Sequence, residues 1–174
     1  MSVLVIYESM FGNTEAIAEA IAEGVRRESE HHPPGPQVSV IPVAQAPVRL
    51  PDDVTMLLVG GPTHAFSMSR ESTRADAVRQ GATGTARIGI REWISKCQPR
   101  ADLPVHTFDT RVHVRMMPGS AAKQAAGALR RKGFRRAKRG ESFWVGGTDG
   151  PLSHDEVVRA RAWGAFVAEA LTPV

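Results

Sequence analysis

The residues best suited to chemistry form one run near the start of the chain, Ser9-Met10-Phe11-Gly12-Asn13-Thr14. The run follows a short apolar segment and leads directly into a segment with helical spacing. A helix N-terminus offers unpaired N–H groups and roughly half a positive charge, which favours anions. Ser9, Asn13 and Thr14 add side-chain donors, and Gly12 permits a tight turn. The pattern predicts a cradle for an anion, most naturally a phosphate monoester, although the same residues would also serve as an ordinary helix cap.

Several other phosphate sites are excluded by the sequence. Neither the P-loop pattern G-x-x-x-x-G-K-[ST] nor the dinucleotide fingerprint G-x-G-x-x-G occurs in the chain. A phosphoacceptor receiver domain needs an aspartate at the end of its third strand, where this chain has Gly60. The anion cradle is therefore of another kind.

Two further segments are expected at the same edge of the fold. The third predicted strand runs into Gly60-Gly61-Pro62-Thr63-His64-Ala65-Phe66-Ser67-Met68, which is apolar and carries an aromatic residue where a solvated turn would be expected. The fourth ends in Phe108-Asp109-Thr110-Arg111. In an open parallel sheet, ligands bind at the carboxyl ends of the strands. A phosphate cradle flanked by two such loops predicts a site for a mononucleotide with a planar base.

The elements that must position these residues alternate between apolar runs and helical patterns. We predict strands at residues 3–7, 38–43, 55–59, 103–108 and 134–145, the last bent around Arg139-Gly140. We predict helices at residues 14–27, 86–97, 118–132 and 153–171, with a short irregular helix and loop within 67–85. Pro118 is expected in the first turn of the third helix, and Ser153 and Glu156 are expected to form a capping box for the last. Buried strands separated by helices indicate a single α/β domain over residues 1–174, with a mostly parallel sheet covered on both faces.

The charge of the chain is uneven. The formal net charge is +4 and the sequence pI about 9.8, but residues 111–139 hold ten basic residues and no acidic one, so the rest has a net charge of −6. We call residues 111–139 the basic segment. Most of its cations are expected at a helix C-terminus or on an exposed sheet edge, where charge is favourable. The functional alternative is a docking surface for an acidic redox partner; nucleic-acid binding is not expected, because the segment lacks interleaved aromatic residues for base stacking.

Other kinds of site find little support. The only cysteine, Cys97, falls on the inward face of a predicted helix, which favours a buried structural thiol. The histidine spacing, including His31 and His32 in a proline-rich loop, gives no metal motif. Asp109 and Asp149 follow predicted strands and are interpreted as capping or turn residues. With no spanning apolar run and no basic leader, we expect a cytoplasmic protein without membrane insertion.

The opening Tyr7-Glu8-Ser9-Met10-Phe11-Gly12-Asn13-Thr14-Glu15 resembles the flavodoxin family, and the resemblance extends over essentially the whole chain. It implies a three-layer α/β/α sandwich with a five-stranded parallel sheet of order 2-1-3-4-5, and FMN as the cofactor. By matching position it assigns the FMN phosphate to the first loop and the flavin ring to two others. The cofactor-binding residues so implied are Ser9, Met10, Phe11, Gly12, Asn13, Thr14, Pro62, Thr63, His64, Ala65, Phe66, Phe108, Asp109, Thr110 and Arg111.

The chain departs from the family pattern at three places. Phe11 stands where many flavodoxins have threonine, so one hydroxyl toward phosphate is lost. No tyrosine is available to cover the outer face of the flavin, so His64, Phe66, Val112 or His113 would have to do so. Ala65 stands where many have a glycine whose peptide turns toward flavin N5, and a Cβ makes a positive φ less favourable by roughly 1 kcal/mol.

The function implied by the resemblance is electron transfer by an FMN-binding, flavodoxin-like carrier with no catalytic residue. If the chain is an enzyme, it is an FMN-dependent oxidoreductase: an NAD(P)H-dependent quinone reductase or a flavodoxin-like dehydrogenase with a second pocket over the flavin. A further alternative is a non-redox binding protein that uses the basic segment and holds flavin loosely or not at all.

Overall fold

The computed structural model describes residues 1–31, 33–114 and 119–171. Its strands are β1 (Ser2–Tyr7), β2 (Gln37–Pro42), β3 (Val54–His64), β4 (Ser67–Met68), β5 (Val105–Val112) and β6 (Ala137–Val145). Its α-helices are α1 (Asn13–Glu30), α2 (Glu71–Arg79), α3 (Ile90–Lys96), α4 (Ala121–Lys132) and α5 (Glu156–Glu169), with one 3₁₀ turn at Val43–Gln45. Strands alternate with helices along most of the chain, as the sequence predicts.

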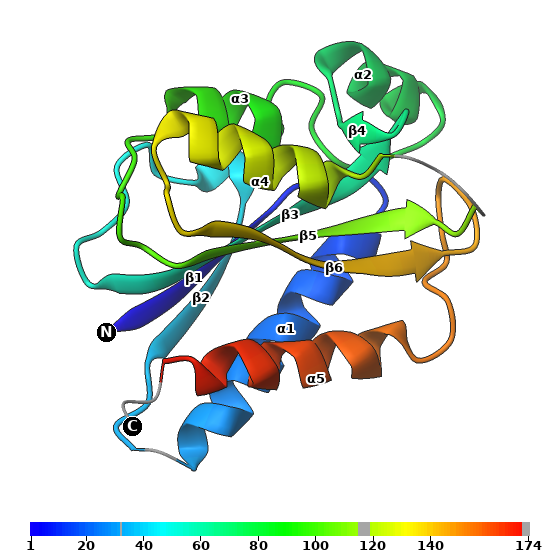
Figure 1. Cartoon of the computed structure of the whole chain (residues 1–174). Helices are drawn as coiled ribbons and strands as arrows, with labels where there is room; N and C mark the ends of the chain where they lie inside the picture. The colour runs from blue at the N-terminus through cyan, green and yellow to red at the C-terminus, as the bar shows by residue number, and fades with distance from the viewer. Residues whose placement is uncertain (32, 115–118, 172–174) are drawn as a thin grey trace.

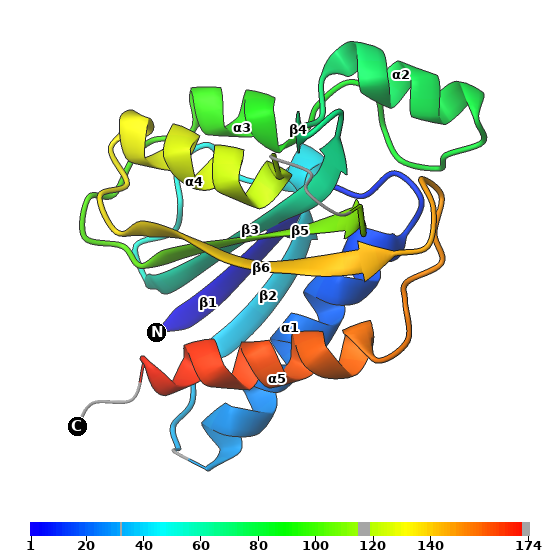
Figure 2. The same ribbon diagram turned by 45° about the vertical axis from the view of Figure 1, so that its right-hand side comes forward.

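The five long strands form a parallel sheet in the order β2-β1-β3-β5-β6, which is the predicted order, and the two-residue β4 pairs antiparallel with β3. Figure 1 shows α3 and α4 on one face of this sheet and α1 and α5 on the other. The carboxyl ends of β3, β5 and β6 point to the same side of the molecule, and the connection from β1 to α1 lies there too; the turned view in Figure 2 keeps this arrangement. The three-layer α/β/α prediction is confirmed.

The apolar strands are buried on both faces, because each face has its own core. Leu57 and Val59 of β3 pack with Trp93 on the side of α3 and α4, whereas Leu58 packs with Ile21 on the side of α1 and α5. This two-sided burial explains the continuous apolar runs, since alternation is expected only where one face meets water.

The third strand is longer than predicted because two glycines continue it. Residues Gly60 and Gly61 stay paired with β5, and the ring of Phe108 fills the place where a Cβ of Gly60 would lie. Glycine suggests a strand end in a sequence, but here it makes room for an aromatic ring from the neighbouring strand. The prediction of a strand at 55–59 was therefore too short.

The fourth strand also extends further, to Val112, so Phe108-Asp109-Thr110-Arg111 lies within β5 and not in a loop after it. The polar residues are held inside the sheet by hydrogen bonds: the Thr107 hydroxyl donates to the Ala122 carbonyl at 2.8 Å, and Asp109 accepts from the start of α4. Polar residue types suggested a loop, but the Thr107 hydroxyl and one Asp109 carboxylate oxygen have hydrogen-bond partners inside the fold, so the strand continues through them.

The end of the sheet differs in detail from the prediction. In place of a bent pair, β6 is one edge strand, and its register against β5 shifts between Thr107 and Asp109. The capping box was wrong as well: the N-cap of α5 is Asp155, and the Glu156 carboxylate accepts from the Trp144 N–H at 2.9 Å and pairs with Arg159 at 3.1 Å. Glu156 therefore ties the helix to the edge strand.

Two other predictions concern segments near α4. The helix begins at Ala121, with Ser120 as its N-cap, and the Ser120 hydroxyl accepts from the Lys123 N–H at 3.1 Å. The predicted Pro118 in its first turn lies outside the described residues, as do Arg115 and His32.

As predicted, Arg135, Arg136, Lys138 and Arg139 are exposed at the edge of the sheet. None of the helices in the described ranges is long and apolar enough to cross a membrane.

The turn between β3 and β4 places two non-glycine residues in the left-handed region, Ala65 at φ 45° and Phe66 at φ 67°. Replacing Ala65 with glycine removes the Cβ that disfavours this conformation. We expect Ala65→Gly to raise the free energy of unfolding by about 1 kcal/mol in urea denaturation. Ala82→Gly is the control, because Ala82 is a half-buried residue after α2 that lacks a positive φ, and an Ala65→Gly variant less stable than the original chain would contradict the expectation.

Candidate functional site

The anion cradle is built at the N-terminus of α1. Gly12 is the N-cap, with φ 89° and ψ −9°, a left-handed conformation that favours glycine. Its N–H donates to the Ser9 hydroxyl at 3.1 Å, and its carbonyl accepts from the Ala16 N–H. Since an α-helix leaves its first N–H groups without intrahelical acceptors, those of Asn13, Thr14 and Glu15 are the donors that this end offers. The local geometry is that of a helix N-terminus able to receive an anion.

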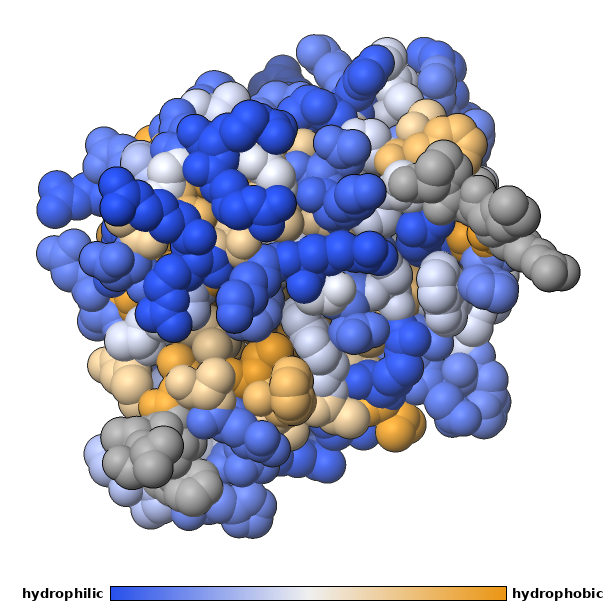
Figure 3. Space-filling model, viewed as in Figure 1, coloured by the Kyte–Doolittle hydropathy of each residue, from blue (hydrophilic) through white to orange (hydrophobic). Residues whose placement is uncertain are grey.

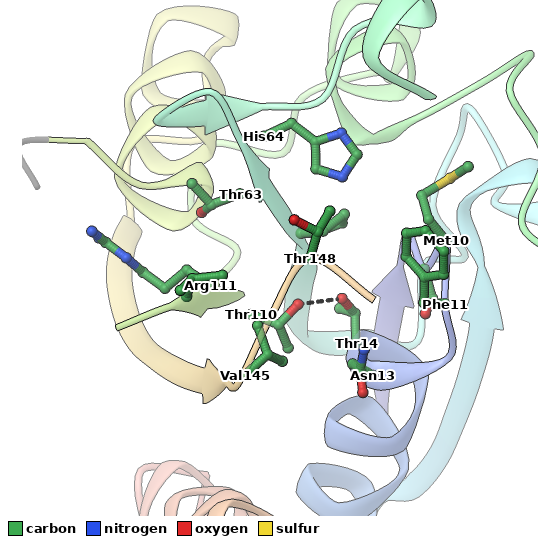
Figure 4. Close-up of a pocket in the computed structure, with 13 residues that line it drawn as sticks. Met10, Phe11, Asn13, Thr14, Thr63, His64, Thr110, Arg111, Val145 and Thr148 are labelled. Carbon is green, nitrogen blue, oxygen red and sulfur yellow. Dashed lines mark hydrogen bonds between the residues drawn. The ribbon is translucent and has the colours of Figure 1, made fainter. Parts of the chain in front are cut away.

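The cradle is fixed to the sheet by a buried pair of hydroxyls. The Thr14 and Thr110 hydroxyl oxygens lie 2.7 Å apart, and either can donate; both residues are buried. Figure 4 shows this bond at the floor of a pocket, joining α1 to β5. Thr14 was expected in the phosphate cradle and Thr110 beside the flavin ring, and the structure makes them direct neighbours.

The pocket lies at the carboxyl edge of the sheet. It is lined by Ser9, Met10, Phe11, Asn13, Thr14, Pro62, Thr63, His64, Thr110, Arg111, Val112, Val145 and Thr148. In Figure 4, Met10 and Phe11 lie on one side, Thr110 and Arg111 on the other, and His64 projects from the end of β3. The volume is about 70 Å³. A single water needs about 10–15 Å³, so this space is sufficient for a group of several atoms such as a phosphate.

Ten of the fifteen residues assigned by the resemblance line this pocket, and five do not. Gly12 shapes the cradle through its backbone and borders a neighbouring cavity. Ala65 and Phe66 form the β3–β4 turn beyond the pocket. Phe108 and Asp109 are buried within β5: the Phe108 ring packs beneath Gly60, and Asp109 is engaged with α4.

Asp109 and Thr63 together cap α4. The Asp109 carboxylate accepts from the Ala122 N–H at 2.8 Å and from the Thr63 hydroxyl at 3.1 Å, while the Thr63 oxygen accepts from the Ala121 N–H at 2.8 Å. A carboxylate at a helix N-terminus is favoured by the helix dipole. The interpretation of Asp109 as a capping residue is confirmed.

Two pocket residues, Val145 and Thr148, were not predicted from the sequence, and Val112 was expected only as a possible cover for the outer face of the flavin. Val145 ends β6 and Thr148 follows it, so a fourth strand end contributes to the site. This loop contacts the cradle directly, because the Asn13 side-chain amide donates to the Asp149 carbonyl at 3.1 Å. The signal was present in the run Gly146-Gly147-Thr148, which follows a parallel strand at the same edge.

His64 is a partly buried imidazole in the pocket wall. Its Nδ1 lies 3.1 Å from the Thr73 hydroxyl of α2. Burial, together with the nearby Arg74 guanidinium, lowers the pKa of His64 below its usual value. The side chain is therefore uncharged at neutral pH, and the wall it forms is suited to a flat, neutral ring.

A buried ionic network supports the loop from behind. Glu8, which directly precedes the loop, accepts from the Ser69 hydroxyl and, at 2.9 Å, from the Ile90 N–H. The fully buried Arg74 donates to the Ser69 hydroxyl at 2.8 Å and pairs with Glu92 at 3.0 Å. Burial raises the pKa of Glu8 above its usual value. The network joins β1, α2 and α3 at the base of the cradle.

The segment after α2 also holds the loop in place. The Met10 carbonyl accepts from the N–H groups of Thr83 and Gly84, each at 3.1 Å. Arg111 lies on the opposite side, with its guanidinium carbon 5.8 Å from the centre of the Trp144 ring, and His113 meets the same ring edge-on at 4.7 Å. The pocket is thus enclosed by contacts from four segments distant in sequence.

Cys97 lies away from the pocket and is buried, as predicted. Burial raises the pKa of its thiol to about 11. Because the thiolate is the reactive form, we expect the folded protein to react with a disulfide reagent at pH 8 about a hundredfold more slowly than the unfolded protein. Equal rates in buffer and in denaturant would show that the thiol is accessible.

Comparisons with known proteins agree with this architecture. No family model and no curated protein sequence matches the chain. Among solved structures, a flavodoxin from the domain Archaea has 18% identity and a TM-score of 0.64, with 98% of this chain and 99% of that chain covered. Oxidised flavodoxin 1 from Bacillus cereus has 15% identity and a TM-score of 0.69, with 99% and 100% covered.

A third similarity is to part of a larger protein. Rubredoxin oxygen:oxidoreductase from Desulfovibrio gigas has 18% identity and a TM-score of 0.61, and 98% of this chain matches 36% of that chain. The two flavodoxins, in contrast, match over nearly their whole length. Together with the sheet order and the flanking helices, these similarities show that the chain has the flavodoxin fold.

Proposed function

We propose that the chain binds one FMN noncovalently at the pocket beside α1 and acts as an electron-transfer protein. The observation that carries the proposal is that a helix N-terminus, shaped by the left-handed backbone of Gly12, meets the Thr14–Thr110 hydroxyl pair in one pocket at the carboxyl edge of a flavodoxin-type sheet. A phosphate monoester is the group that such a donor set suits best.

The residues have separate tasks in this proposal. The N–H groups at the start of α1 and the hydroxyls of Ser9 and Thr14 bind the phosphate, and Asn13 holds the loop after β6 against the cradle. Pro62 and His64 form one wall for the ring, and the end of β5 forms the other. When bound, FMN supplies the uptake and release of electrons, so no side chain has to act as a catalytic acid or base.

A redox partner has to approach the pocket edge of the sheet. Within the basic segment, Arg111 lines the pocket, but Lys138 and Arg139 belong to the other end of β6. Arg139 and Val145 are six residue steps apart along an extended strand, a distance of about 20 Å. A partner held at Lys138 and Arg139 would not face the pocket, so we propose that the partner docks beside Arg111 and the β3–β4 turn.

The experiment that tests the role uses the FMN-loaded protein with NADPH, a flavodoxin reductase and cytochrome c. An electron carrier accelerates cytochrome c reduction in proportion to its concentration and oxidises no NADPH when the reductase is omitted. Turnover of NADPH with a quinone in the absence of the reductase would support the quinone reductase alternative instead. A preparation that fails to take up FMN would favour the non-redox binding protein.

A further inference from the structure

A second cavity lies at the opposite end of the sheet, between the start of β6 and the end of α5. Its volume is about 690 Å³, against about 70 Å³ for the pocket beside α1. The lining residues are Met56, Pro104, His106, Arg136, Lys138, Arg139, Gly140, Glu141, Trp163, Phe166, Val167, Glu169 and Ala170. Sites for small molecules commonly enclose about 300–1,000 Å³. None of these residues belongs to the predicted flavin site, so the cavity has no assigned role.

The floor of this cavity is aromatic. Two lining rings, Trp163 of α5 and His106, meet edge-on at a centroid distance of 6.3 Å, and the buried rings of Phe108 and Phe143 support Trp163 from behind at 6.2 and 6.3 Å. Burial and the neighbouring cations lower the pKa of His106 below its usual value, so its ring is uncharged at neutral pH. Such a surface favours a flat apolar body, because aromatic rings pack well edge-on or offset.

One wall is apolar and exposed to solvent. Phe166 of α5 has 65% of its surface exposed, although it lies next to the buried Val167. Figure 3 shows hydrophobic residues gathered over the region between the sheet and α5, directly below a band of strongly hydrophilic residues. An exposed large apolar side chain beside a cavity indicates a surface that a ligand can cover.

The rim is predominantly cationic. It carries Arg136, Lys138 and Arg139 from the edge strand and its approach, and the acidic residues Glu141 and Glu169. Arg136 donates to the Asp102 carbonyl at 3.2 Å, whereas within the described residues no ion pair or hydrogen bond engages the side chains of Lys138 and Arg139. Two exposed cations among the residues that line a partly aromatic cavity are complementary to a molecule with a flat body and an anionic head.

We propose that this cavity binds a small aromatic carboxylate, with the ring system on Trp163 and Phe166 and the carboxylate at Lys138 and Arg139. The site is independent of the FMN pocket, since the parallel strands place the two at opposite ends of the sheet. Binding here therefore does not require flavin.

The test is calorimetric titration of the protein, carrying one equivalent of FMN where it binds, with 2-naphthoate and with the neutral 2-naphthamide. We expect saturable one-to-one binding of 2-naphthoate and at least tenfold weaker binding of 2-naphthamide. Lys138→Glu/Arg139→Glu should weaken 2-naphthoate binding at least tenfold, and Phe166→Ala about fivefold. These side chains are exposed, so the variants are expected to fold.

Matched controls separate the site from general charge and surface effects. Arg135→Glu alters an exposed cation of the same segment outside the cavity, and Val158→Ala removes an exposed apolar side chain from the same helix. Both should leave the affinity within twofold. Equal affinity for the amide, an unchanged affinity in the double variant, or displacement of 2-naphthoate by FMN would overturn the proposal.

Discussion

Replacing Asn13 with aspartate should weaken FMN binding about a hundredfold, which corresponds to about 2.7 kcal/mol. Asn13 lines the pocket at the first position of α1, so the new carboxylate would lie beside the proposed phosphate site. Two unit charges about 4 Å apart near a protein surface repel by about 4 kcal/mol before screening by salt. The measurement is a fluorescence titration of FMN at low ionic strength.

Riboflavin provides the control for this prediction, because it has the ring system without the phosphate. Asn13→Asp should leave riboflavin affinity within about threefold of its original value, and added salt should recover part of the lost FMN affinity. Asn13→Ala loses the hydrogen bond to Asp149 without adding charge, so it measures the contribution of that bond alone. Equal losses of FMN and riboflavin binding in the aspartate variant would mean that the phosphate is not beside Asn13.

Replacing Arg74 with methionine should lower the free energy of unfolding by about 3–5 kcal/mol, because it removes one partner from a buried ionic network. Arg74 is fully buried and contacts Ser69 and Glu92, and its Nε donates to the Ala86 carbonyl at 3.0 Å. Its loss leaves Glu8 and Glu92 without their cation. Chemical denaturation gives the free energy directly.

The same variant should also weaken FMN binding, since Glu8 immediately precedes the cradle. Arg79→Met is the matched control: it lies on the same helix and pairs with Asp76, but both side chains are largely exposed. An exposed pair contributes about 0–1 kcal/mol, so the control should stay close to the original stability. A loss below about 1 kcal/mol in Arg74→Met would show that the network does not stabilise the fold.

The sequence was most informative about the part of the site that is built from consecutive residues. The apolar β1, the run Ser9–Thr14 and the helical pattern after it are adjacent in the chain, so a strand, a turn and a helix N-terminus follow from residue types alone. The strand order also agreed with the fold that the resemblance implied. These features require no knowledge of distant contacts.

The features that sequence could not predict depend on contacts between distant segments. Gly60 resembled a strand end, but Phe108 from β5 occupies the space beside it. Asp109 resembled a loop residue, but it caps a helix that begins a dozen residues later in the chain. Thr148 lines the pocket because the loop after β6 contacts the start of α1, a contact between segments far apart in the chain. A buried polar group is explained by its hydrogen-bond partner, and a glycine such as Gly60 by the side chain that occupies the space beside it. The sequence does not identify these partners.

The central claim, that the pocket beside α1 binds FMN through its phosphate, is tested most directly by the visible absorption spectrum of the purified protein during titration with FMN. We expect the flavin bands to shift and saturate at one FMN per chain, and riboflavin to bind more weakly. A protein that is colourless as purified and leaves the spectrum of added FMN unchanged would contradict it.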